Sequence, residues 1–284
     1  AFILKAIKNL DPKKLDFDPN YYIYGGGLVY SSAVILKIAE LFDIIEIKSG
    51  ISYYLENPSE IGKIYYLLRI LVASFAAVGL IFLFYFIEKF HGLKFAYLTL
   101  IIILFNPETL ISSRVIEPHI FVLPFFLGAV YFAIKLLEKQ KNNYSLILYG
   151  LFSGLSIGTQ ATSFYIIVPF FLIQYIYFNK GREFKKICKN FIIFFSYLSL
   201  SFFILNPYSI INFSGFITDI FTGMDNVASI KSNNVNFYEN FYAPYQISLF
   251  YVILFFASIF YNIFYIKNEK NKIYLSLVIP SVCV

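Results

Sequence analysis

The sequence predicts an all-α integral membrane protein with several membrane-spanning helices, and three observations support this fold class. Hydrophobic residues make up 59% of the chain and charged residues only 14%, whereas charged residues form about 25% of a typical soluble domain. The apolar runs 64–87, 120–137 and 245–266 are each about long enough to cross a ~30 Å hydrocarbon layer as a helix. The alternation of polar and apolar residues that is typical of a membrane β-barrel is missing from the sequence.

Apolar runs along the whole chain give about seven to eight predicted transmembrane helices. The predicted spans are 64–87, 95–106, 119–137, 144–160, 162–179, 190–206, 245–266 and 272 to the end. The chain begins without Met and ends inside an apolar run, so we expect that it is a fragment of a longer protein.

Lysine and arginine residues gather in the short loops that follow alternate spans, and such a bias marks the cytoplasmic side. They are Lys89, Lys94, Lys139, Lys141, Lys180, Arg182, Lys185, Lys186, Lys189, Lys267, Lys270 and Lys272. Alternating spans then place the loops 107–118 and 207–244 on the external side. We therefore expect an external first loop over 1–63, followed by a transmembrane domain over 64–284.

Residues 28–45 form an apolar run that charged side chains interrupt. Its length would suit a membrane span, but Lys37, Glu40 and Asp43 fall within it. We expect an amphipathic juxtamembrane helix in the outer interface, with Lys37 and Glu40 turned to water. A simple span is the alternative.

The richest polar patch is residues 106–119, which enter directly into a predicted span. It contains Glu108, Arg114, Glu117 and His119. A carboxylate in such a place can act as a base or a metal ligand, and an arginine can neutralise a phosphate leaving group. An ordinary polar loop is the alternative interpretation.

A second external patch alternates carboxylates with aromatic rings, a composition that suits carbohydrate binding. Its candidate residues are Asp16, Asp18, Asn20, Tyr21, Tyr22 and Tyr24. Arg69 lies early in the span 64–87, where it can either extend to the interface or hold a phosphate. Gln160 and Tyr208 stand at the external ends of two other spans.

Motifs for nucleotide or metal binding are missing from the sequence. Gly25, Gly26 and Gly27 lack the preceding strand that a phosphate-binding loop needs, so we expect a flexible turn there. Cys188 and Cys283 are too few for a disulfide framework.

In their order, these segments resemble bacterial glycosyltransferase family 39 and related GT-C membrane enzymes, the relatives of protein O-mannosyltransferases and of the lipid A aminoarabinose transferase. The similar segments are LDFDPNYYIYGGGLVY (15–30), RILVASFAAVGLIFLFYFIEKFHG (69–92), FNPETLISSRVIEPHIFVLPFFLGAVYFA (105–133), GLFSGLSIGTQATSFYIIVP (150–169) and NPY (206–208).

The resemblance implies a helical bundle of the GT-C type. It also implies an inverting transfer of a sugar from a polyprenyl-phosphate donor to a glycan, lipid or protein acceptor. The enzyme would lie in the bacterial cytoplasmic membrane with its active face outward. The resemblance implies no nucleic-acid partner and identifies no cofactor with certainty. It leaves open whether the enzyme uses a divalent cation.

The resemblance also assigns roles to residues of this chain. The main acidic base is expected just before Ala1, while Glu117 or His119 would fill the place of a second acid. Gln160 stands where relatives often carry a lysine. The substrate-binding residues would be Asp16, Asp18, Asn20, Tyr21, Tyr22, Tyr24, Arg69, Arg114, Gln160 and Tyr208.

Two other classes of function remain open from the sequence. A transporter, flippase or channel would use charged residues inside the membrane to line a pathway. A catalytically inactive relative of GT-C architecture would share the loops but lack the base.

Overall fold

The computed structural model describes residues 2–10, 16–20, 22, 25–48, 51–106, 115–138, 143–179, 181, 183–219 and 222. The chain divides into two compact units, Ala1–Phe216 and Ile217–Val284, and the helices named below belong to the first.

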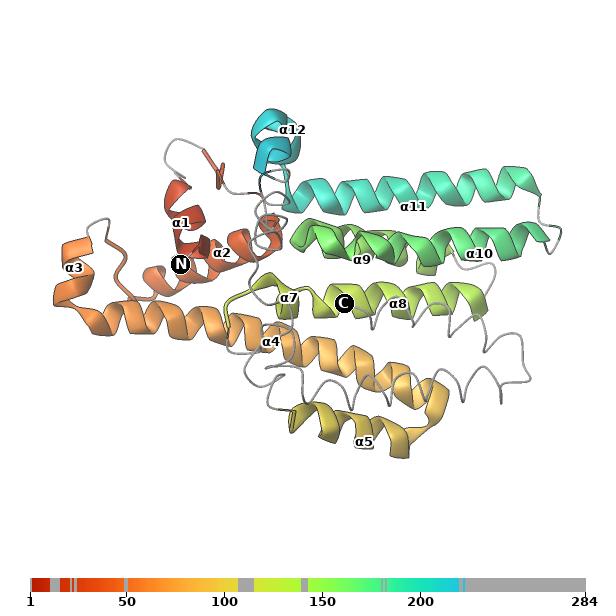
Figure 1. Ribbon diagram of the computed structural model, residues 1–284, viewed down its shortest axis with the longest axis horizontal. Coiled ribbons are helices and arrows are strands. Elements are labelled where there is room, and N and C mark those ends of the chain that lie inside the picture. The colour runs from red at the N-terminus through yellow and green to blue at the C-terminus, as the bar shows by residue number, and fades with distance from the viewer. Residues whose placement is uncertain are drawn as a thin grey trace, which may run out of the picture. The chain divides into compact units, whose positions relative to one another are not determined.

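Helices dominate the described residues, which confirms the predicted all-α class (Figure 1). They are α1 (Phe2–Asn9), α2 (Gly26–Leu41), α3 (Ile51–Glu56), α4 (Pro58–His91), α5 (Leu93–Leu104), α7 (Pro118–Phe121), α8 (Leu123–Glu138), α9 (Asn143–Thr159), the 3₁₀ helix η2 (Ala161–Ile167), α10 (Val168–Asn179), α11 (Phe184–Leu205) and α12 (Tyr208–Ile211).

Four helical segments are long and apolar enough to cross a membrane. They are Pro58–Lys89, Pro118–Leu137, Ala161–Asn179 and Phe184–Leu205, and Leu93–Leu104 is a shorter apolar helix. Each overlaps a predicted span, and α9 matches the predicted span 144–160. The predicted spans 245–266 and 272 to the end lie outside the described residues.

Helix α4 begins at Pro58, before the start of the predicted span at residue 64, because a helix can continue beyond the hydrocarbon layer. Pro58 takes the first helical position, where its missing N–H costs nothing and its fixed φ suits a helix. One face of α4 packs Ile64 and Leu68 against Leu36 and Ala39 of α2. Other faces of the bundle expose large apolar side chains, as expected where lipid is the solvent.

Helices α9 and α11 pack closely because small residues line one face of α9. Gly150, Gly154 and Gly158 recur every four residues, so they share that face. A Cβ built on Gly154 would lie 2.1 Å from the carbonyl oxygen of Leu198. Such spacing is the small-residue pattern by which membrane helices approach one another, and the sequence prediction did not use it.

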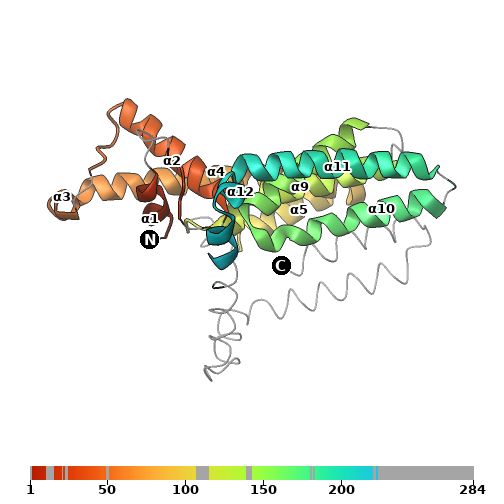
Figure 2. The same ribbon diagram turned by 90° about the horizontal axis from the view of Figure 1, so that it is seen from above.

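Helix α2 lies at one end of the bundle, beside the ends of α9 and α11, in both views (Figures 1 and 2). Gly25 has φ +64°, and a Cβ on Gly26 would lie 1.8 Å from the carbonyl oxygen of Leu205. The glycines therefore allow backbone to meet backbone, and the expected flexible turn is wrong.

The helix predicted over 28–45 forms over Gly26–Leu41. It ends earlier because Asp43, with φ 53°, turns the chain. Lys37 and Glu40 pair with each other at 2.5 Å on the exposed side. Its place in the outer interface, and the division at residues 63 and 64, stay predictions.

Candidate functional site

Polar residues from segments far apart in the sequence gather at the end of the bundle that α2 covers. The start of α7, the break between α9 and η2, and the junction of α11 with α12 all lie there (Figure 1). The described residues 16–20 and 22, below called the segment 16–22, join them through hydrogen bonds of Phe17 with α2 and α12. The C-terminal ends of α4, α8 and α10 lie at the opposite end (Figure 1).

Asn206 holds three helix ends together from a buried position at the end of α11. Its Oδ1 accepts a hydrogen bond from the backbone N–H of Gly26 at 2.7 Å. Its Nδ2 donates to the carbonyl oxygen of Gly158 at 2.8 Å. Because both backbone groups are at helix ends, the side chain satisfies groups that helices leave unpaired.

The segment 16–22 is held on both sides through Phe17. The Phe17 N–H donates to the Tyr208 hydroxyl at 2.8 Å, and the Tyr30 hydroxyl donates to the Phe17 carbonyl at 3.1 Å. Asn9 of α1 donates to the carbonyl oxygen of Pro19 at 2.8 Å. The backbone of this loop is therefore fixed by residues of α1, α2 and α12.

Asp18 is occupied by donors from within the protein. Its carboxylate accepts hydrogen bonds from the Tyr22 hydroxyl, from the Asn20 N–H at 2.8 Å and from Asn212 Nδ2 at 3.1 Å. Burial, and then the bond to Asp18, raise the pKa of Tyr22 above its usual value. This carboxylate therefore fixes the loop more than it offers itself to a ligand.

His119 and Gln160 form a direct pair between α7 and the end of α9. Gln160 is only 8% exposed, and its Nε2 lies 2.8 Å from His119 Nδ1 and 2.7 Å from Thr162 Oγ1. An amide nitrogen can only donate, so Nδ1 of His119 accepts and a neutral ring carries its proton on Nε2. Within the described part of the chain, the Nε2–H has no hydrogen-bond partner and is left for another group.

Glu117 stands immediately before α7 and is exposed. Among the described residues its carboxylate makes no hydrogen bond or ion pair, and it caps no backbone N–H. A negative charge is favoured beside the helix N-terminus. Among the described residues, Glu117 is therefore an exposed carboxylate at this end without a hydrogen-bond or ion-pair partner.

The remaining candidates fall into three groups. Arg69 is exposed on α4, and within the part of the chain that the structure describes it has no ion pair. Asp16 accepts from the Asp18 N–H at 3.0 Å, and Asn20 has a left-handed backbone with φ 47°. The other three candidates, Tyr21, Tyr24 and Arg114, lie outside the described residues.

A cavity of about 410 Å³ opens between the segment 16–22, α2 and the junction of α11 with α12. Its walls are Phe17, Tyr30, Ile204, Pro207, Tyr208 and Ile211. Of these the sequence prediction singled out Tyr208, whereas Tyr30 was treated only as part of a helix. No group of three metal-ligating side chains occurs within the described ranges.

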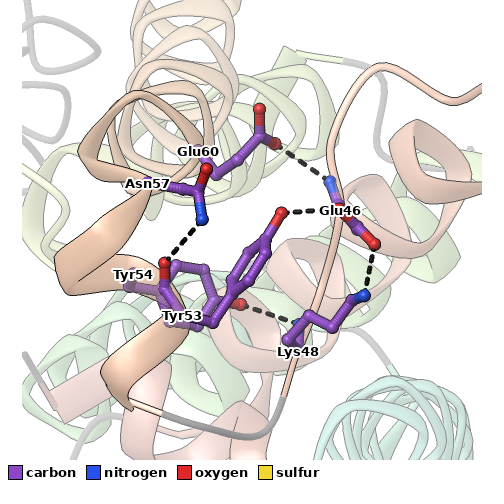
Figure 3. A network of polar contacts seen from close by, with 6 residues as sticks. All are labelled: Glu46, Lys48, Tyr53, Tyr54, Asn57 and Glu60. Atoms are coloured by element: carbon purple, nitrogen blue, oxygen red, sulfur yellow. Dashed lines mark hydrogen bonds and ion pairs between the residues drawn. The ribbon is translucent and has the colours of Figure 1, made fainter.

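A second polar network holds the loop after α2 to α3 and α4 (Figure 3). Glu46 accepts from the Tyr53 hydroxyl at 2.5 Å and pairs with Lys48 at 2.6 Å. Its N–H donates to Glu60 at 3.1 Å. The bond to Glu46 raises the pKa of Tyr53 to about 12, and Lys48 and then Tyr53 lower the pKa of Glu46. The sequence prediction did not identify this network.

The comparison with protein families decides the class of this chain. The family model described as dolichyl-phosphate-mannose-protein mannosyltransferase matches residues 61–210, from α4 to α12. The chain belongs to this family. Its members are membrane glycosyltransferases of the GT-C type, which confirms the resemblance seen in the sequence. No curated protein and no solved structure matches the chain.

Proposed function

We propose that this protein transfers a sugar from a polyprenyl-phosphate donor to an acceptor on the extracytoplasmic face of a bacterial cytoplasmic membrane, with inversion at the anomeric carbon. The observation that carries the proposal is the unpaired carboxylate of Glu117, two residues from His119, at the end of the bundle where the other polar candidates gather.

Acid–base chemistry is the role that this pair suits. An exposed carboxylate can accept the proton of an acceptor hydroxyl as that oxygen attacks the sugar. The Nε2–H of His119 can donate a hydrogen bond to an oxygen whose charge grows as the donor bond breaks. Glu117 would then act as a second acid–base carboxylate beside the main acidic base expected just before Ala1, and His119 as the stabilising donor.

Phosphate binding is assigned to arginine in this proposal. Arg69 has an exposed guanidinium without an ion pair among the described residues, and such a fork binds phosphate oxygens in a fixed pose. Arg114, which precedes α7 in the sequence, would assist. The donor lipid tail would lie along the apolar helices, and the energy comes from the donor bond, so no nucleotide is needed.

The sugar and acceptor would be held by the residues of the first loop. Asp16, Asn20, Tyr21 and Tyr24 would contact them, while Asp18 and Tyr22 would fix the loop because their hydrogen bonds are made within the protein. A divalent cation could join a donor phosphate to Glu117, and the test below includes it.

The test uses the full-length protein in proteoliposomes with polyprenyl-phosphate sugars, with and without Mg²⁺. We expect release of the lipid phosphate and a product of inverted anomeric configuration, measured by NMR. Glu117→Gln should slow transfer by about 10²–10⁴-fold, the range for loss of a general base. Glu183→Gln is the matched control, because Glu183 is also a carboxylate just before a helix, and that helix, α11, begins at the other end of the bundle (Figure 1).

Three results would overturn the proposal. Transfer could be missing with every donor, as in an inactive relative; the lipid-linked sugar could cross the bilayer without cleavage, as in a flippase; or Glu117→Gln could be as active as Glu183→Gln.

A further inference from the structure

We propose that the cavity beside α12 binds the uncharged, hydroxyl-bearing head of a membrane amphiphile, such as a glycosyl lipid. This binding site goes beyond the proposed transfer reaction and does not depend on it. Four properties of the cavity lead to this ligand class: its size, its two tyrosine hydroxyls, its lack of charged lining residues and its exposed isoleucine side chains.

The size of the cavity suits a small ligand. Its volume of about 410 Å³ falls within the range of roughly 300–1,000 Å³ that is usual for ligand pockets. Phe17, Tyr30 and Tyr208 supply aromatic rings, and Pro207 an apolar face, as sugar C–H groups require. The walls are fixed, because the hydrogen bonds of Phe17 join both tyrosines to the same backbone segment.

The two tyrosine hydroxyls leave a complementary pair of sites. The Tyr208 hydroxyl accepts from the Phe17 N–H, so its own proton remains to be donated. The Tyr30 hydroxyl donates to the Phe17 carbonyl, so a lone pair remains to accept. Neither tyrosine has a further partner among the described residues. A free donor beside a free acceptor matches a hydroxyl group of a ligand, because a hydroxyl can accept one hydrogen bond and donate another.

The charge around the cavity argues against an anionic head. None of its six lining residues carries a cation. Burial, followed by the Tyr208 hydroxyl and the Asp18 carboxylate, raises the pKa of Tyr30 above its usual value. The surroundings of Tyr30 therefore disfavour a negative charge. A phosphate, which only accepts when ionised, would also leave the Tyr30 lone pair without a donor.

The side of the cavity formed by Ile204 and Ile211 suits an apolar chain. Ile204 is 65% and Ile211 is 71% exposed. Ile204 is the penultimate residue of Phe184–Leu205, a helix long and apolar enough to cross a membrane, so in such a span it would lie near the interface. A ligand with its head between the tyrosines would therefore place its alkyl chain over these two side chains.

The test compares photoreactive alkyl probes that share one chain and differ in the head: glucoside, phosphate and ammonium. Each is added to the full-length protein in phosphatidylcholine nanodiscs, and the labelled residues are mapped by mass spectrometry. We expect saturable labelling of residues 204–211 by the glucoside, about tenfold stronger than by the phosphate or ammonium probe. Excess unlabelled glucoside should abolish it.

Two variants of neighbouring residues give a matched comparison. Ile211→Trp fills the cavity and should weaken glucoside labelling by about tenfold, whereas Ile210→Trp should not, because Ile210 is 61% exposed and does not line the cavity. Tyr208→Phe removes the free donor, and with it the acceptor of the Phe17 N–H, without adding volume, and should weaken labelling roughly five- to tenfold.

Equal labelling in both tryptophan variants would show that the glucoside binds elsewhere and would overturn the inference. So would a phosphate probe that labels as strongly as the glucoside. Because the readout is binding alone, failure of the transfer reaction leaves this test intact, and the converse also holds.

Discussion

Replacing Asn206 is the sharpest test of how the site end is assembled. Asn206→Ala removes the partners of two buried backbone groups, the N–H of Gly26 and the carbonyl of Gly158, which it meets at 2.7 and 2.8 Å. Each buried group left unpaired costs about 1–3 kcal/mol. We therefore expect a loss of stability of about 2–6 kcal/mol.

Asn206→Asp should behave differently because its charge can be removed. The ionised carboxylate still accepts from Gly26 but faces the carbonyl oxygen of Gly158, whereas the protonated form can donate to that oxygen. Burial of the introduced carboxylate raises its folded-state pKa above the unfolded value. Stability is therefore greatest at low pH and is lost as the pH rises through the folded pKa.

The assay is thermal unfolding of the purified protein in detergent across a pH series. Asn179→Ala is the control, because Asn179 is exposed at the end of α10 and such surface changes cost within about 0.5 kcal/mol. The reasoning about Asn206 is refuted if Asn206→Ala unfolds at the same temperature as Asn179→Ala. It is also refuted if Asn206→Asp is no more stable at low pH than at high pH.

Three further predictions concern other parts of the molecule. Gly154→Ala should cost about 1–3 kcal/mol in a melting assay, because its Cβ would strike the backbone of α11; unchanged stability would contradict that packing. Glu46→Gln should lower the pKa of Tyr53 from about 12 toward 10.0, measured by NMR of labelled tyrosine, and an unchanged titration would contradict the bond. In the natural sequence, the stabilisation from the bond between Tyr53 and Glu46 should persist below pH ~10 and fade as the pH rises toward ~12. In ¹⁵N NMR, the neutral ring of His119 should carry its proton on Nε2, and in Gln160→Glu the tautomer protonated on Nδ1 should become more populated, with the chain's other histidine as an internal control. A ring protonated on Nδ1 in the natural sequence would contradict the pair of His119 and Gln160.

The helices could be predicted from the sequence because they depend on local properties. Runs of apolar residues and their flanking lysines identify α4 and α11 without knowledge of the fold. Pro118 likewise marks the start of α7. The spacing of Gly154 with its neighbouring glycines was also present in the sequence, and only the rule for small residues was needed to interpret it.

The site could be predicted only in part because its bonds join distant residues. Asp18 looks like a free carboxylate in its own segment, but one of its donors is Asn212, which is 194 residues away. Gly26 looks like part of a flexible turn until its partner Asn206, 180 residues away, is known. Composition indicates which residues can do chemistry, and the fold decides which of them are already occupied.

The most direct test of the central claim is donor cleavage by the full-length protein. Polyprenyl-phosphate sugars labelled in the lipid are supplied with candidate acceptors, and release of the lipid phosphate is measured for the natural sequence, Glu117→Gln and Glu183→Gln. We predict acceptor-dependent release that Glu117→Gln slows by about 10²–10⁴-fold and Glu183→Gln preserves. No release from any donor, or equal release by both variants, would contradict the account.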